Sequence, residues 1–145
     1  MTINYNEPIT FGRDGVAARL NCGGIDFSEN GGCSWTLGPV ADVDIQLPFA
    51  RQDVEVRLEA SPFVVPKLLM AQNVFVFLGG LFVGYYTLKG HMVRSFPVNR
   101  SVVSGRATRL SLVLPNATSP RTMDLNEDLR ELGIYLSSIT FKTMP

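Results

Sequence analysis

Acidic side chains and one arginine occur in the two least regular stretches of the sequence. Asp26, Glu29 and Asn30 lie in a glycine-rich segment, and Asp128 and Arg130 lie close to the C-terminus. Carboxylate, amide and guanidinium groups bind the hydroxyl groups of a ligand through charge-assisted and bidentate hydrogen bonds. They can equally form ion pairs that hold the two segments together. We favour this second interpretation, because a planar guanidinium satisfies several acceptors at once.

The aromatic side chains offer a second kind of binding surface. Trp35, the only tryptophan, follows the glycine-rich segment, and its ring could stack on the face of a sugar. A lone tryptophan flanked by small residues at the start of a strand is more often part of the core, which is the interpretation we favour. Phe82, Tyr85 and Tyr86 could form an aromatic patch. Alternation along a strand puts the two tyrosines on opposite faces, so one of them should be buried.

No set of side chains in the sequence has the spacing of a metal site. Asp42 and Asp44 share a strand face and could contribute to a calcium site, but a strand lacks the loop carbonyls that complete such a shell, so a solvated face is the better interpretation. Cys22 and Cys33 have no histidine nearby and make a poor zinc site. We expect free thiols rather than a disulfide, because the first residues do not resemble an export signal. We predict no metal and no cofactor.

Motifs of catalysis are also missing. His91 is the only histidine, and the sequence has neither a Gly-x-Ser-x-Gly elbow nor a His-Glu-x-x-His helix that would supply a nucleophile or a metal. Glu55 and Glu59 flank Arg57 and could act as a pair of glycosidase carboxylates. An open sheet face with an intervening arginine favours a surface charge ladder instead. We therefore predict that the protein is not an enzyme and has no catalytic residues.

The overall composition bears on the classes of partner. The 13 basic and 13 acidic residues among 145 balance, so no global field attracts nucleic acid. The most apolar stretch, 74–86, is shorter than the roughly 20 residues of a spanning helix, so no membrane span is predicted. Residues 1–8 lack the charged and apolar regions of an export signal, which favours a cytoplasmic location if residue 1 is the natural start. The length suits one domain over residues 1–145.

The elements expected to position these side chains are short β-strands. Apolar and polar residues alternate along several segments, and we expect seven to nine strands in all. Gly79-Gly80 predicts a tight hairpin turn, and a change of parity at Ser137-Ser138 predicts a β-bulge. Asn126–Leu132 could form one helical turn. The clearest strands are expected at 40–47, 53–60, 73–78, 81–88, 91–98, 107–114 and 133–141.

The fold class follows from this pattern. Many short strands with turn residues between them, and no sustained helical periodicity, are typical of an all-β protein. We predict an antiparallel β-sandwich of jelly-roll type with at most one or two short helical turns. An immunoglobulin-like topology is the nearest alternative, but the Cys…Trp…Cys spacing of those domains is missing.

Several short motifs occur in an order that resembles a known family. They are a glycine-rich segment with Glu29, Trp-Thr-x-Gly at 35–38, a valine-rich hairpin at 74–80, Ser119-Pro120, and Asp-x-Arg-x-Leu-Gly at 128–133. The chain resembles a β-sandwich domain that recurs in bacterial proteins of surface-polysaccharide metabolism and is often attached to, or encoded beside, glycosyltransferases. The resemblance covers residues 11–141. The hairpin departs from the family in having Gly-Gly where Asn-Gly is expected, although both pairs suit a tight turn.

The resemblance implies a carbohydrate-related accessory role. We expect a non-catalytic carbohydrate-binding or accessory module linked to bacterial surface-polysaccharide metabolism, with a carbohydrate, a glycosyltransferase or another protein domain as its partner. The alternative is a structural or protein-interaction domain, forming a homodimer or docking a partner, without a sugar ligand. Loops held on a rigid scaffold often carry function, so a site is expected in segments 21–34 and 115–128. The predicted ligand-binding residues are Asp26, Glu29, Asn30, Trp35, Asp128 and Arg130.

Overall fold

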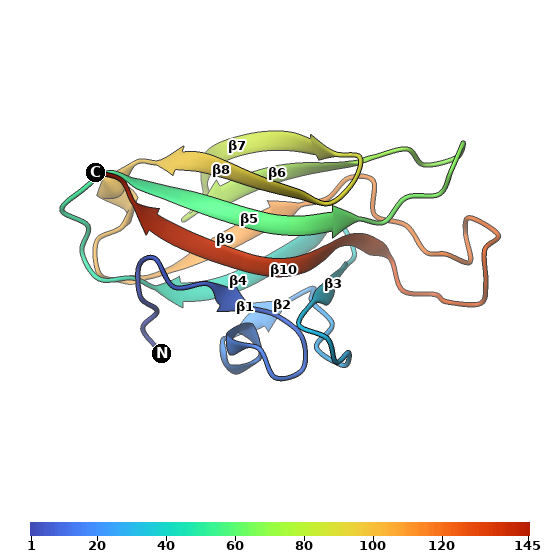
Figure 1. The fold of residues 1–145 in the computed structure, drawn as a ribbon, viewed down its shortest axis with the longest axis horizontal. Helices are drawn as coiled ribbons and strands as arrows, with labels where there is room; N and C mark the ends of the chain where they lie inside the picture. The colour runs from blue at the N-terminus through green and yellow to red at the C-terminus, as the bar shows by residue number, and fades with distance from the viewer.

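A computed structural model describes residues 1–145 as two antiparallel β-sheets packed face to face (Figure 1). The first sheet has the order β1 (Ile9–Thr10), β10 (Leu132–Thr143), β5 (Val54–Pro62) and β8 (Met92–Val98), and β10 also pairs with β3 (Ser34–Leu37). The second sheet has the order β2 (Cys22–Gly23), β4 (Val40–Gln46), β9 (Ala107–Val113), β6 (Gln72–Leu78) and β7 (Leu81–Leu88).

Helical structure is limited to two short 3-10 turns, η1 (Val16–Arg19) and η2 (Arg100–Val102). Neither has the length and hydropathy that a helix needs to cross a membrane. Two antiparallel sheets and only two short helical turns confirm the predicted all-β sandwich of jelly-roll type.

Strand alternation builds the core between the sheets. In β5, the side chains of Val54, Val56 and Leu58 are buried, whereas the residues between them are partly exposed. The other long strands contribute in the same way to one cluster of 28 buried residues. Burying an apolar side chain of this size stabilises the folded state by roughly 1.5–3 kcal/mol. The apolar face of each strand therefore fixes its register, because a slip of one residue would expose that face.

Two local predictions about the strands are confirmed. Gly79-Gly80 joins β6 to β7 with φ angles of 58° and 81°, and two positive φ angles are what a tight primed turn requires. The pairing of β10 with β5 shifts register between Leu136 and Ser138, which is the predicted bulge. The bulge allows Ile139 and Phe141 to face the core although their parity differs from that of Leu136.

The helical turn that we expected at Asn126–Leu132 is not formed. The Asn126 side-chain oxygen accepts a hydrogen bond of 2.8 Å from the backbone N–H of Asp128, and Asp128 accepts one of 3.0 Å from the backbone N–H of Arg130. Such local side-chain bonds compete with the backbone bonds of a helix. They hold the segment in an irregular conformation that brings Asp128 next to Arg130.

The connections between strands gather at the two ends of the sandwich (Figure 1). The β5–β6 and the long β9–β10 connections lie at one end. The β4–β5 connection, η2 and the C-terminus lie at the other. Loops held on a rigid scaffold often carry function, so these connections are candidate positions for a binding site.

Candidate functional site

Two segments that are far apart in the sequence meet at β3. This strand pairs with the first half of β10, so that Trp35 lies opposite Tyr135. The backbone N–H of Asp26 donates to the carbonyl of Trp35 at 2.9 Å, which extends the pairing into the glycine-rich segment. The glycine-rich segment and the start of β10 therefore lie side by side.

A tight contact explains two residues of the sequence motifs. The buried Thr36 hydroxyl accepts a hydrogen bond of 2.9 Å from the backbone N–H of Ile134. A Cβ atom on Gly133 would lie 2.8 Å from Oγ1 of Thr36 and 3.2 Å from the side chain of Leu114. Glycine is thus required for β10 to approach β3 this closely. These motif residues serve the scaffold rather than a ligand.

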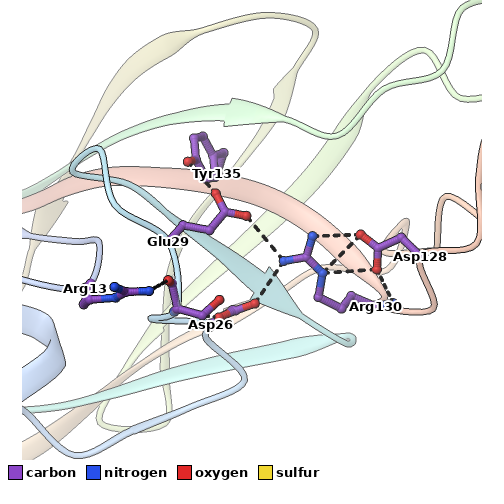
Figure 2. Close-up of polar contacts among 7 residues, drawn as sticks. Arg13, Asp26, Glu29, Asp128, Arg130 and Tyr135 are labelled. Carbon is purple, nitrogen blue, oxygen red and sulfur yellow. Dashed lines mark hydrogen bonds and ion pairs between the residues drawn. The ribbon is translucent and has the colours of Figure 1, made fainter.

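Arg130 is the centre of a charged cluster (Figure 2). Its Nη1 atom is 2.9 Å from Oδ2 of Asp26 and 3.4 Å from Oε1 of Glu29, and its Nη2 atom is 2.7 Å from Oδ2 of Asp128. Tyr135 donates its hydroxyl to Oε2 of Glu29 at 2.8 Å. We call these five residues the Arg130 cluster. The ion pairs that we favoured between the two segments are present.

The charges of the Arg130 cluster do not cancel. Three carboxylates face one guanidinium, which leaves two net negative charges at neutral pH. Hydrogen bonds from Ser28, and in addition from Arg130, lower the pKa of Asp26 below its usual value. Hydrogen bonds from Arg130 lower the pKa of Asp128. The cluster therefore keeps its aspartates ionised well into the acid range.

The Arg130 cluster is also accessible to solvent. The exposed fraction of the side chain is 36% for Arg130, 34% for Glu29 and 25% for Asp128. The hydrogen bond to Glu29 raises the pKa of Tyr135 to about 12, so the phenol stays neutral at physiological pH. Side chains that hold one another in place and remain partly exposed can offer their free donors and acceptors to hydroxyl groups.

Trp35 lies beside the cluster on the outer side of its sheet. Its neighbours in β3 are buried, whereas Trp35 is only half-buried. Its ring centroid is 4.6 Å from that of Tyr135 and 6.1 Å from that of Phe63. Trp35 thus packs on a small second apolar cluster and not in the main core, contrary to the interpretation we favoured. Part of its ring remains accessible.

Asn30 lies apart from the Arg130 cluster, whereas two residues that the sequence did not predict, Arg13 and Tyr135, contact the glycine-rich segment. Asn30 is exposed and lines a separate shallow pocket together with Arg13. Arg13 donates to the carbonyl oxygen of Ser28 at 2.6 Å and so holds the glycine-rich segment in place. Nothing in the sequence distinguishes Arg13 from the other arginines. Tyr135 could have been found only from its position opposite Trp35.

The other acidic and sulfur-containing candidates have separate roles. Asp42 accepts a hydrogen bond of 2.7 Å from a serine hydroxyl, and Asp44 pairs with Arg109 at 2.8 Å. Cys22 and Cys33 are free thiols. No three His, Cys, Asp or Glu side chains converge as metal ligands would. Asp42 and Asp44 therefore belong to a solvated, hydrogen-bonded sheet face, as expected.

His91 has closer partners than the sequence indicated. Its Nδ1 is 2.8 Å from Oγ of Ser61, and its Nε2 is 3.0 Å from Oε2 of Glu59. Nucleophilic catalysis by such a set also needs oxyanion donors and a site that excludes water. The His91 side chain is 53% exposed on the outer face of the first sheet. Glu55 pairs with Arg57 instead, so the two glutamates considered as a glycosidase pair have different partners.

Solved structures with this fold include carbohydrate-binding modules. CsCBM6-3 from Clostridium stercorarium, in complex with cellobiose, has 12% identity and a TM-score of 0.57 over 99% of this chain and 98% of that chain. A β-1,3-glucan-binding CBM6 from Bacillus halodurans has 13% identity and a TM-score of 0.57 over 99% and 100%. The CBM36-1 domain of a multidomain xylanase from the hindgut metagenome of Trinervitermes trinervoides has 11% identity and a TM-score of 0.55 over 96% and 98%.

At these identities the likeness shows a shared β-sandwich fold. No protein-family model matches the sequence, and no curated protein does.

Proposed function

We propose that this chain binds carbohydrate without catalysing a reaction, and that its binding site is the Arg130 cluster together with Trp35. The observation that carries the proposal is the position of partly exposed carboxylates and a guanidinium beside a half-buried tryptophan ring. Sugars present hydroxyl groups at their edges and C–H groups on their faces, so they fit a site with both kinds of surface. Modules with the same fold, solved with cellobiose or described as β-1,3-glucan-binding, support this function.

In the proposed complex, a sugar ring lies on the accessible part of Trp35. Its hydroxyl groups donate to Glu29 and Asp128 and accept from Arg130. The ion pairs of the cluster orient these groups before the ligand arrives, which reduces the entropy lost on binding. The two net negative charges favour a neutral sugar over an acidic one.

We further propose that the glycan is a bacterial surface polysaccharide and that the chain works beside a glycosyltransferase. The resemblance of the motifs at 35–38 and 128–133 to those of surface-polysaccharide proteins supports this setting. A glycan array that carries bacterial surface polysaccharides together with glucans and xylans tests it. Selective binding of the glucans or xylans would contradict the setting and leave the binding function standing.

The site itself is tested with Glu29→Ala and Arg130→Ala. Loss of one charge-assisted hydrogen bond should weaken binding of the best array ligand by about tenfold or more. Glu55→Ala is a matched control, because Glu55 is a partly exposed carboxylate that forms an ion pair with Arg57 and lies opposite Lys142, at the end of β10 far from Arg130. Circular dichroism checks that each variant is folded. Unchanged binding in both folded variants would contradict the site, and no binding to any glycan would contradict the function.

An exposed aromatic surface favours a second candidate function, the docking of a partner protein or a second copy. On the outer face of the second sheet, Phe75 packs on Tyr85 and Phe77 packs on Phe82, with ring centroids 4.9 and 5.6 Å apart. Phe82 is 60% exposed, and Tyr85 is exposed while Tyr86 is buried, as predicted. Such patches often mark interfaces. Light scattering that shows a dimer, lost in Phe82→Ser, would support this function, and a strict monomer would exclude the homodimer.

A further inference from the structure

The β4–β5 connection and η2 lie at the end of the sandwich opposite the β9–β10 connection (Figure 1). Residues at this end line two adjoining pockets. The larger, of about 470 Å³, lies between the β4–β5 connection and η2, and it is lined by Phe49, Ala50, Arg51, Asn99, Arg100 and Ser101. The smaller, of about 270 Å³, lies between the start of β7 and the end of β8. Asn99 lines both pockets.

The larger pocket is basic. Arg51 and Arg100 line it, and no acidic residue does. Neither guanidinium takes part in an ion pair, in contrast to Arg130 and Arg109. Planar guanidinium groups with free N–H donors bind phosphate through paired hydrogen bonds.

Backbone contacts hold the lining of the larger pocket in place. Arg100 Nη1 donates to the carbonyl oxygen of Arg51 at 3.0 Å, and the backbone N–H of Ala50 donates to the carbonyl of Val103 at 3.4 Å. The Asn99 side-chain oxygen accepts a hydrogen bond of 3.0 Å from the backbone N–H of Ser101 and so caps η2. The two loops are therefore joined before any ligand binds, which lowers the cost of binding.

The smaller pocket is apolar. Six of its eight lining residues are hydrophobic. Phe82 at its edge is 60% exposed, and Val83 and Val102 are only half-buried. A hydrocarbon chain in this pocket would remove these side chains from water.

We propose that this end of the sandwich binds a small amphiphile in which a phosphate group is joined to an apolar chain. The phosphate lies between Arg51 and Arg100, and the chain passes Asn99 into the pocket beside Phe82 and Val102. A sugar would fit less well, because the lining has no carboxylate to accept hydrogen bonds from its hydroxyl groups. A free phosphate ion would leave the apolar pocket uncovered. This site is separate from the proposed glycan site and does not depend on it.

An NMR titration with decyl phosphate, kept below the concentration at which it forms micelles, tests the proposal. The amide signals of Asn99, Arg100 and Val102 should shift, and those of Glu29 and Tyr135 should not. Decyl maltoside has a similar chain without charge, and inorganic phosphate has the charge without a chain. Each should bind at least about tenfold more weakly than decyl phosphate.

Variants complete the test. The double variant Arg51→Gln with Arg100→Gln should weaken decyl phosphate binding by about tenfold. Arg51→Gln alone should weaken it less and keeps the bond from Arg100 to the backbone, so it serves if the double variant does not fold. Arg19→Gln removes another exposed arginine without an ion pair and should change nothing.

Four results would overturn the proposal. The first is decyl maltoside binding as tightly as decyl phosphate, and the second is inorganic phosphate doing so. The third is unchanged affinity in the folded double variant, or in Arg51→Gln where only that variant folds. The fourth is the absence of shifts around Asn99 at saturating decyl phosphate.

Discussion

Replacing Arg130 with glutamine should destabilise the protein. The guanidinium lies among the carboxylates of Asp26, Glu29 and Asp128, and its removal leaves these charges close together without a cation between them. Because 36% of the Arg130 side chain is exposed, solvent screens the ion pairs and their contribution must be discounted. We expect the loss of Arg130 to lower the free energy of unfolding by about 1–2 kcal/mol at neutral pH.

The pH dependence of this loss follows from the two aspartates. Hydrogen bonds from Ser28 and then Arg130 lower the pKa of Asp26, and hydrogen bonds from Arg130 lower that of Asp128, from an ordinary value of 3.8. A carboxyl group whose pKa is lowered by folding stabilises the protein above its unfolded pKa, and this stabilisation is lost as the pH falls through the folded pKa. The difference between the wild type and Arg130→Gln should therefore be complete at neutral pH and shrink below pH 3.8.

Urea unfolding, followed by the fluorescence of Trp35, measures the effect, because Trp35 is the only tryptophan. Arg109→Gln is a matched control, since Arg109 pairs with the single carboxylate of Asp44 and is more exposed than Arg130. The control should cost less stability at neutral pH. The reasoning is refuted if Arg130→Gln costs no more than the control, or if its cost is the same at neutral pH and at about pH 3.

Three further variants test packing and the site. Gly84→Ala should lower the free energy of unfolding in urea by about 1–3 kcal/mol, because a Cβ there would lie 2.2 Å from the ring of Phe96; unchanged stability would contradict this packing. Trp35→Ala should cost about 2 kcal/mol in urea unfolding followed by circular dichroism, because this variant lacks the only tryptophan, and a loss above about 3 kcal/mol would indicate a main-core position. Glu29→Gln should lower the pKa of Tyr135 from about 12 towards 10.0, measured by phenolate absorbance, and an unchanged pKa would contradict their hydrogen bond.

The long strands could be predicted from the sequence because their side chains alternate between the core and the solvent. The bulge in β10 was visible for the same reason, as a break in that alternation. The short strands β1, β2 and β3 have two to four residues, too few to show a period. They form because their backbones pair with longer neighbours, which is a property of the assembled sheet.

Of the contacts in the candidate site, only the ion pairs could be predicted from the sequence. An arginine in one irregular segment and two acids in the other were enough to predict the ion pairs of Arg130 with Asp26 and Glu29. The bond from Tyr135 to Glu29 depends on the register of β3 on β10, which is irregular between Leu132 and Tyr135, so the spacing of residues does not reveal it.

The equal numbers of acidic and basic residues hide an uneven distribution of charge. The β9–β10 connection carries four acids and two arginines, namely Arg121, Asp124, Glu127, Asp128, Arg130 and Glu131. Segment 99–106, at the other end of the sandwich, carries Arg100 and Arg106 and no acid (Figure 1). In about 0.1 M salt, charges are screened beyond about 10 Å, so each end presents its own field. Zero net charge is therefore compatible with a neutral glycan at the acidic end and a phosphate amphiphile at the basic end.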